Sequence, residues 1–241
     1  PVAFLEETSA ASPYVARNLG MKHAKGEIYA FTDISCIACE SWLTEGVKAL
    51  LENDADLAGG EVVFDIDNTA TAAELYDSIT NVQMRKSILE RGVGKGGNLF
   101  IRKSVFDALG PWPTQRSGGD VKFTGRATQA GYKMVYVEEA RVLYPARRFW
   151  ALLKKSFRVG LGQPAIWKFS KLRLLRRLAG TLWSGLHIPN AKGLRKEIEQ
   201  SSRLKGREIS IVKIWFVSWT CRLARQSGNM VGILRILMKR N

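Results

Sequence analysis

The chain has 241 residues, of which 46% are hydrophobic and 24% are charged, and its formal net charge is +15. An apolar fraction of this size can bury a core, which excludes a disordered, collagen-like or disulfide-scaffold protein. The excess of positive charge indicates an anionic partner, such as nucleic acid, an acidic membrane surface or a phosphorylated substrate.

The positive charge is unevenly distributed along the chain. Residues 1–140 carry 14 Lys+Arg and 19 Asp+Glu, a net charge of −5, whereas residues 141–241 carry 23 and 3, a net charge of +20. An acidic first part and a strongly basic second part indicate two regions with different roles. We therefore expect one domain over residues 1–147 and a separate basic region over residues 148–241.

The three cysteines, Cys36, Cys39 and Cys221, are the odd and sparse set that is typical of a reducing compartment. Cys36 and Cys39 have the spacing of a redox pair or of half a zinc site, but no second such pair accompanies them, so we expect two semi-buried thiols. No signal peptide is visible, and the chain opens on Pro1 in a strand-like run over residues 2–5. We expect an upstream piece to be missing.

In the first part, short apolar strands alternate with helical patterns. Strands are expected at residues 27–33, 60–66, 98–101 and 133–137, and helices at residues 42–51, 71–90, 105–109 and 119–130. This alternation predicts an α/β fold with a mostly parallel sheet and flanking helices. Ligands of such sheets bind beyond the carboxyl ends of the strands, which makes Asp33 a candidate site residue.

The second part contains three basic and apolar stretches, at residues 148–188, 193–207 and 209–239. No window of 18 apolar residues in it lacks charge, so a membrane-spanning helix is disfavoured. Tryptophans stand among the Lys and Arg residues, which is typical of helices lying in a membrane interface. They are Trp150, Trp167, Trp183, Trp215 and Trp219. We favour interfacial binding over the alternative, a helical subdomain packed on the α/β core with solvated charges.

A series of short motifs runs through residues 12–160. They are Ala16-Arg17-Asn18-Leu19-Gly20, Ala24-Lys25-Gly26-Glu27-Ile28, Ala30-Phe31-Thr32-Asp33, Trp42-Leu43, Gly96-Gly97-Asn98-Leu99-Phe100-Ile101-Arg102-Lys103, Ser117-Gly118-Gly119-Asp120-Val121-Lys122-Phe123, Arg126-Ala127 and Ala130-Gly131-Tyr132. In this order and spacing they resemble the second half of the nucleotide-binding region of GT-A fold glycosyltransferases of family 2. The resemblance implies a Rossmann-like GT-A fold and the inverting transfer of a sugar from a nucleotide-sugar donor to a hydroxyl acceptor.

The resemblance also implies a catalytic base. Asp120 matches the residue that takes the proton of the acceptor hydroxyl while the oxygen attacks the anomeric carbon from the opposite face. From the residues alone, an Asp that follows two glycines and precedes a helix is better explained as a helix N-cap, and only the resemblance favours the catalytic role.

Further residues match segments that bind the substrates. Gly97 and Asn98 match the lining of the donor-sugar and acceptor pocket, and Gly119 lies beside the matched base. Arg17 and Asn18 match the segment that enters the nucleotide site. From the residues alone, the alternatives are a glycine-rich turn feeding a strand and a capped, solvent-facing helix start.

The metal-binding Asp-x-Asp motif of the family is altered in this chain. It is Asp33-Ile34-Ser35 here, so Asp33 is kept as a candidate metal ligand while Ser35 replaces the second carboxylate. Mg²⁺ and Mn²⁺ favour carboxylate oxygens, so the change weakens the site. Where the family often has His-Pro followed by Arg, this chain has Tyr144-Pro145-Ala146-Arg147-Arg148.

Three explanations of this departure stay open. The enzyme binds a divalent metal loosely, through Asp33 and the substrate diphosphate. Alternatively it is metal-independent, and Arg147, Arg148 or Lys95 neutralises the leaving group. Or it has lost catalysis.

The leading hypothesis is a membrane-associated glycosyltransferase of cell-envelope polysaccharide biosynthesis. Its catalytic domain is expected on the cytoplasmic face of the membrane, with the basic helices against anionic lipid and a lipid-linked or saccharide acceptor. Because the first nucleotide-binding strand–helix unit of the family is missing, we expect this piece to be inactive by itself. The alternative is a non-catalytic, glycosyltransferase-like membrane protein, and a nucleic-acid partner is not expected, because no RNA- or DNA-binding motif accompanies the basic segment.

Overall fold

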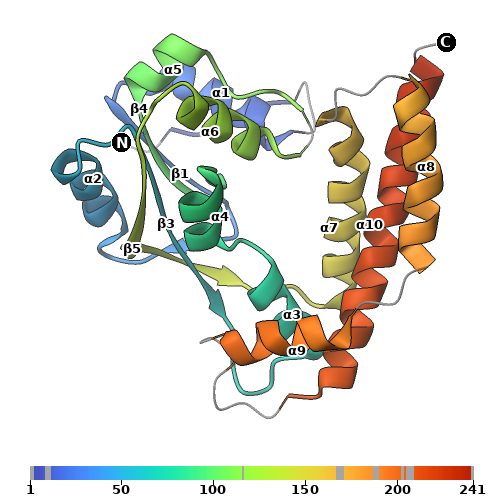
Figure 1. The fold of residues 1–241 in the computed structure, drawn as a ribbon. Coiled ribbons are helices and arrows are strands. Elements are labelled where there is room, and N and C mark those ends of the chain that lie inside the picture. The colour runs from blue at the N-terminus through green and yellow to red at the C-terminus, as the bar shows by residue number, and fades with distance from the viewer. Residues whose placement is uncertain are drawn as a thin grey trace. The chain divides into compact units, whose positions relative to one another are not determined.

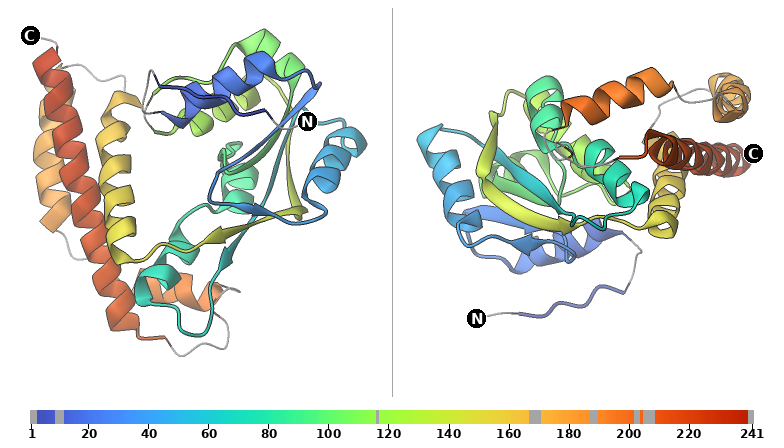
Figure 2. Two further views of the ribbon diagram at one scale, coloured as in Figure 1. Left: turned by 180° about the vertical axis from the view of Figure 1, so that it is seen from behind. Right: turned by 90° about the horizontal axis from the view of Figure 1, so that it is seen from below.

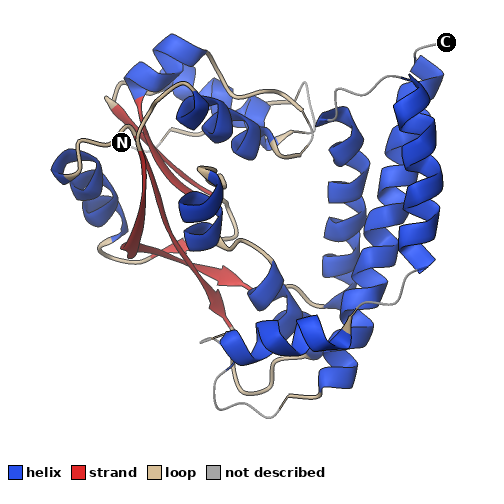
Figure 3. Cartoon of the chain, viewed as in Figure 1, coloured by secondary structure: helices blue, strands red, loops and turns tan. Residues whose placement is uncertain are grey.

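The computed structural model describes residues 3–8, 12–115, 117–166, 171–186, 190–201, 204 and 209–239. The chain forms two compact units. We call residues 1–65 with 82–145 the sheet unit, and residues 66–81 with 146–241 the helical unit. The described strands all lie in the sheet unit, and the described elements of the helical unit are all helices (Figure 3). Our expected division between residues 147 and 148 differs from this, because segment 66–81 belongs to the helical unit.

The sheet unit contains five described strands. They are β1 (Ile28–Thr32), β2 (Ile37–Ala38), β3 (Leu57–Asp65), β4 (Asn98–Arg102) and β5 (Met134–Pro145). They lie in the order β1-β4-β3-β5-β2. Of the described pairings, β3 and β5 are parallel, and β1–β4, β3–β4 and β2–β5 are antiparallel.

The α/β class is therefore confirmed, but the expectation of a mostly parallel sheet is wrong for the described strands. Alternation of strands and helices predicts parallel crossovers only if each connection returns the chain to the same edge of the sheet. The connection between β3 and β4 instead reverses the chain direction, which no local pattern in the sequence reveals.

Helices cover both faces of this sheet. The helices of the sheet unit are α1 (Pro13–His23), α2 (Trp42–Glu52), α4 (Met84–Arg91), α5 (Lys103–Leu109) and α6 (Gly119–Gln129). Helices α2 and α4 lie on opposite faces (Figures 1 and 2). Successive residues of a strand point to opposite faces, so Ala58 of β3 packs with Leu50 of α2, whereas Gly59 faces Met84 and Ile88 of α4.

The expected helix over residues 71–90 is in fact two helices. Helix α3 (Ala72–Thr80) ends before α4 begins, and Val82 between them has a φ of +46°. This left-handed conformation is rare for a β-branched residue and interrupts the helix. The strand expected at residues 133–137 extends to Pro145 in β5, and the described residues 3–5 form no strand.

The helical unit is built around two closely packed helices. Its elements are α3, α7 (Phe149–Gly162), the 3₁₀ helix η1 (Gln163–Ile166), α8 (Lys171–Leu186), α9 (Ala191–Gln200) and α10 (Ile211–Lys239). Helices α7, α8 and α10 lie side by side in both views of Figure 2. A Cβ atom on Gly228 of α10 would overlap the carbonyl oxygen of Phe157 in α7, and one on Gly160 would overlap that of Arg225. The two backbones therefore approach at a distance that only glycine permits. Among the described residues we find no helix with the length and apolar character needed to cross a membrane.

Candidate active site

The pairing of β1 with β4 brings Asp33 beside the glycine-rich segment. Thr32, the last residue of β1, lies opposite Asn98, the first residue of β4. Asp33 therefore follows at the position facing Gly97, where a Cβ atom would lie 3.4 Å from the Asp33 Oδ2 atom. The Thr32 hydroxyl donates to the Gly97 carbonyl at 3.1 Å and holds the two segments together.

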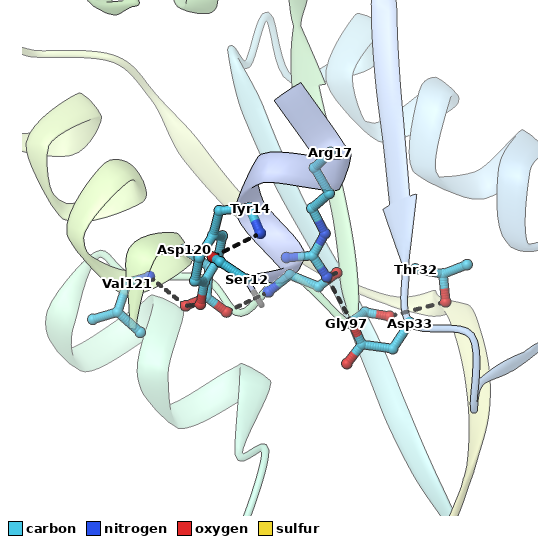
Figure 4. A network of polar contacts seen from close by, with 9 residues as sticks. Ser12, Tyr14, Arg17, Thr32, Asp33, Gly97, Asp120 and Val121 are labelled. Atoms are coloured by element: carbon cyan, nitrogen blue, oxygen red, sulfur yellow. Dashed lines mark hydrogen bonds and ion pairs between the residues drawn. The ribbon is translucent and has the colours of Figure 1, made fainter. Parts of the chain in front are cut away.

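Asp120 lies in the first turn of α6, where three donors hold its carboxylate (Figure 4). The Tyr14 hydroxyl and the Val121 N–H donate to Oδ1, both at 2.9 Å, and the Gly96 N–H donates to Oδ2 at 2.8 Å. The N-cap position is taken by Gly118, whose φ is +74°. Asp120 is thus not the N-cap of this helix, and its carboxylate is oriented by donors from three segments of the chain.

Arg17 and Gly96 together connect the side chains of Asp33 and Asp120. Its Nη2 donates to Asp33 Oδ1 at 2.6 Å and to the Gly96 carbonyl at 2.9 Å, while the Gly96 N–H bonds to Asp120 (Figure 4). A Cβ atom at residue 96 would overlap the Arg17 guanidinium, so a larger residue there would displace this group. The Arg17 side chain is 13% exposed and that of Asp33 is 46% exposed, so the acid faces solvent while the arginine fixes it from beneath.

Helix α1 fixes the loop that leads to α6. Ser12 caps α1 by accepting from the Tyr14 N–H, and its hydroxyl also donates to the Gln115 carbonyl at 3.1 Å. The Asn18 amide pairs with the backbone of Trp112 on both sides, donating to its carbonyl and accepting from its N–H at 2.9 Å each. Asn18 therefore orders this loop, and its predicted contact with a nucleotide stays a prediction.

Gly119 is required by close packing beside the candidate base. A Cβ atom there would lie 2.9 Å from the Tyr14 ring and 2.8 Å from the Pro113 carbonyl oxygen, which is closer than real side chains come. Its predicted place in the substrate pocket is not tested by these contacts.

Asn98 is fully buried and hydrogen-bonded on both sides of its amide. Its Oδ1 accepts from Trp42 Nε1 at 2.8 Å, and its Nδ2 donates to the carbonyls of Glu61 and Ala140 at 2.9 and 2.8 Å. These bonds join β4 to α2, β3 and β5. The structure therefore places Asn98 behind the site as a positioning residue, and its predicted contact with substrate stays a prediction.

Burial changes the proton affinities of two groups around Asp120. It raises the pKa of Tyr14 well above its usual value, and the neighbouring Asp120 charge raises it further. Tyr14 therefore keeps its proton and remains a hydrogen-bond donor. Burial lowers the pKa of Lys95, while the charge of Asp120 opposes that effect.

The residues at the end of β1 do not fit a divalent metal site built by the protein. Asp33 is paired with Arg17, and Ser35 supplies only a hydroxyl. In the part of the chain that the structure describes, no group of three His, Cys, Asp or Glu side chains is placed to hold an ion. Hard cations favour several carboxylate oxygens, whereas here a guanidinium already occupies the carboxylate. Cys36 and Cys39 are partly exposed and form no disulfide.

Arg147 and Arg148 belong to the helical unit, where both face acidic side chains. The Arg147 N–H and Nη1 lie 3.0 and 3.3 Å from Oδ2 of the buried Asp77, and Arg148 Nε lies 3.8 Å from Glu74 Oε1. Their predicted role at the leaving group stays a prediction.

Two residues of this network, Tyr14 and Gly96, were not among the predicted site residues. The sequence carries a signal for each. Ser12 followed by Pro13 is the pattern of a helix start, with an N-cap and a proline in the first turn, and it places Tyr14 at the beginning of α1. Gly96 lies in the glycine-rich run that resembles the family's motif.

Comparison with known proteins gives three similarities. A family model described as glycosyl transferase family group 2 matches residues 39–220. The chain is 41% identical over 236 residues to glycosyltransferase AglE of Haloferax volcanii, covering 96% of this chain and 77% of that protein. It is also similar to the solved mannosyltransferase PcManGT of Pyrobaculum calidifontis in complex with GDP-Man and Mn²⁺, with a TM-score of 0.49 and 15% identity. That match covers 99% of this chain, which spans 58% of the mannosyltransferase chain.

Proposed function

The chain belongs to glycosyl transferase family group 2, and on this premise we propose that it transfers a sugar from a nucleotide-sugar donor to a hydroxyl acceptor with inversion. The observation that carries the proposal is the Asp120 carboxylate, held by Tyr14, Val121 and Gly96. A carboxylate oriented by fixed donors is a suitable general base, because its geometry is set before the substrate arrives.

In the proposed reaction, Asp120 accepts the proton of the acceptor hydroxyl. The hydroxyl oxygen forms a bond to the anomeric carbon while the bond from that carbon to the diphosphate oxygen breaks, and the electron pair leaves with the nucleoside diphosphate. Attack from the face opposite to the leaving group inverts the anomeric configuration. Tyr14 and Gly96 act as positioning residues that orient the base.

The leaving group becomes more negative as its bond to the sugar breaks, so a cation near it lowers the barrier. Arg17 is held at the end of β1 by Asp33, at the position where the family has its metal motif. We propose that Arg17 supplies positive charge there, with Lys95, Arg147 and Arg148 as the further basic candidates. Guanidinium groups are well suited to phosphate oxygens.

The test of the base is Asp120→Asn in the full-length protein, assayed for nucleotide release and sugar transfer. Loss of a general base lowers kcat by about 10²- to 10⁴-fold. Asp107→Asn, an exposed carboxylate on α5, is the matched control and keeps its activity. NMR of the product reports the inverted anomer. Undiminished transfer by Asp120→Asn, or a product that retains the donor configuration, would remove Asp120 from this role.

Whether turnover depends on a divalent metal is tested separately. We expect turnover of the full-length protein to survive excess EDTA, because the Arg17 guanidinium already lies at the end of β1, where the family has its metal motif. Complete loss of turnover that Mn²⁺ restores would contradict this expectation.

We further propose that the helical unit lies against an anionic membrane surface on its cytoplasmic face, where it meets a lipid-linked acceptor. An aromatic series supports this: Trp150, Phe149, Phe216, Trp219 and Trp215 contact one another in turn, with ring centroids 5.4 to 6.5 Å apart. The Trp150 side chain is 73% exposed and that of Phe216 is 49% exposed. Exposed aromatic rings on basic helices favour the interface between lipid and water.

Two other tryptophans of the expected set cannot be assigned to this surface. Trp167 lies outside the described residues, and the side chain of Trp183 is not among those described.

The second candidate function is a non-catalytic relative that binds a nucleotide sugar without transferring it. The altered Asp33-Ile34-Ser35 motif favours it. This protein would bind nucleotide sugar in calorimetry but release no nucleotide with any donor or acceptor, and Asp120→Asn would leave its behaviour unchanged.

A further inference from the structure

The glycine-rich segment 92–97, which supplies one of the donors to Asp120, is itself held by helix α6. Two threonines of this helix, Thr124 and Thr128, are hydrogen-bonded to the backbone of the segment. They lie four residues apart, so their side chains project from the same face of the helix. The contact between α6 and the segment therefore has two polar points, of which Thr124 is nearer to Asp120 along the helix.

Thr124 is fully buried and joins Asp120 to Gly94. Its hydroxyl donates to the backbone carbonyl of Asp120 at 2.8 Å and accepts from the Gly94 N–H at 3.0 Å. The Gly94 carbonyl lies farther from the same hydroxyl, at 3.3 Å. A threonine hydroxyl often donates to the carbonyl four residues earlier in its own helix. That bond takes the only proton of the hydroxyl, which leaves the lone pairs of its oxygen for the Gly94 N–H.

Gly94 is also packed from its other side. A Cβ atom there would overlap the side chains of Leu99 in β4 and Met134 in β5, so the segment lies tightly between α6 and the sheet. Gly96 follows two residues later and donates its N–H to Asp120 Oδ2 at 2.8 Å. Because neighbouring Cα atoms are only about 3.8 Å apart, the place of Gly94 limits where the Gly96 N–H can lie.

We propose that Thr124 is a positioning residue for Asp120, which it orients through the glycine-rich segment. Its hydroxyl fixes Gly94 against the first turn of α6, and this places the Gly96 N–H where it meets the Asp120 carboxylate. The inference rests on the proposed function, since Asp120 is the base of that reaction.

The test replaces the hydroxyl group by a methyl group of similar size, in Thr124→Val. We expect kcat of the full-length protein to fall by about 10- to 100-fold, since a misplacement of about 1 Å can cost about 10²-fold in rate. The KM for the donor should stay unchanged, because an interaction with the base is made in the transition state. Thr124→Ser keeps the hydroxyl and should restore kcat.

Thr128→Val is the matched control. The Thr128 hydroxyl also holds the segment, by donating to the Gly92 carbonyl at 2.9 Å, but it lies one helical turn farther from Asp120. This variant should lower the free energy of unfolding in urea and leave kcat unchanged. Unchanged kcat in Thr124→Val, or equal losses of kcat in the two valine variants, would overturn the proposal.

The amide signal of Gly96 gives a readout that does not depend on activity. NMR of the protein with isotope-labelled glycine records this signal, and Asp120→Ala identifies it by removing the acceptor. Thr124→Val should shift the signal toward its position in Asp120→Ala, whereas Thr128→Val should leave it in place. An unmoved signal in folded Thr124→Val would overturn the proposal. If Asp120→Asn kept its activity, the proposed function would fail, and the Gly96 signal would decide whether Thr124 places this donor.

Discussion

The two units of this chain differ in charge and in the way they pack. The sheet unit carries 15 Lys+Arg and 16 Asp+Glu, a net charge of −1, while the helical unit carries 22 and 6, a net charge of +16. The sheet unit buries large rings against one another, with Phe106 and Phe123 stacked at 4.5 Å beside Trp112. In the helical unit, α7 and α10 instead meet backbone to backbone at Gly160 and Gly228.

The helical unit contains an acidic segment that offsets part of its positive charge. Segment 66–81 has three carboxylates and no Lys or Arg, and it lies in the helical unit. Asp77 of this segment is fully buried and lies 3.3 Å from Arg147 and 3.6 Å from Lys155. The acidic segment of the first part of the sequence is thus a countercharge for the second.

Replacement of Asp77 is the most severe way to break this arrangement. Asp77→Asn leaves Arg147 and Lys155 without their buried partner, and loss of one member of a buried ion pair costs about 3–5 kcal/mol. Urea denaturation measures the free energy of unfolding. The control is Asp107→Asn, which breaks an exposed pair with Lys103 in the sheet unit and should cost no more than about 1 kcal/mol. Equal losses in the two variants would show that Asp77 has no special role.

The close contact of α7 and α10 predicts that replacing a glycine by alanine there lowers the stability, which is the opposite of the usual effect. Gly→Ala inside a helix normally stabilises by about 1 kcal/mol. At Gly228 the added methyl group meets the Phe157 carbonyl, so Gly228→Ala should destabilise by about 1–3 kcal/mol through overpacking. Gly180→Ala in α8, where no other atom lies within 4 Å, should show the normal stabilising sign. Thermal unfolding of both variants decides, and stabilisation by Gly228→Ala would mean that the helices do not pack this closely.

The salt dependence of vesicle binding tests whether the positive charge of the helical unit contributes to membrane binding. Raising the salt concentration from about 0.1 to about 1 M shortens the screening length from about 10 to about 3 Å. The fraction of protein that floats with anionic vesicles should then fall by at least about tenfold. Trp150→Ala should weaken binding at both salt concentrations, because it removes an apolar contact that salt does not screen. Vesicle binding that does not respond to salt would argue against an electrostatic role for the helical unit.

Local patterns predicted a large part of this structure. The apolar run ending at Asp33, the helix after Ser41 and the helix ending before Gly131 all lie where periodicity and end signals placed them. The motif series around Asp33, Gly97 and Asp120 also predicted the family correctly.

The misplaced features depend on contacts between distant residues. No sequence pattern around Val82 predicts the left-handed backbone conformation that divides the expected helix into two. The pairing of Asp33 with Arg17, rather than with a second acid, arises from the placement of α1 beside the end of β1.

Spacing and residue type along the chain are enough to predict the α/β class, the family and the position of Asp120 at a helix start. Tertiary structure alone decided that Tyr14 and Gly96 hold Asp120, that Asn98 is buried behind the site, and that segment 66–81 belongs with the basic helices. The physical reason is the same in each case. Hydrogen bonds and buried charges are satisfied across sequence separations of 24 to 106 residues, and such partners are set by how the elements pack.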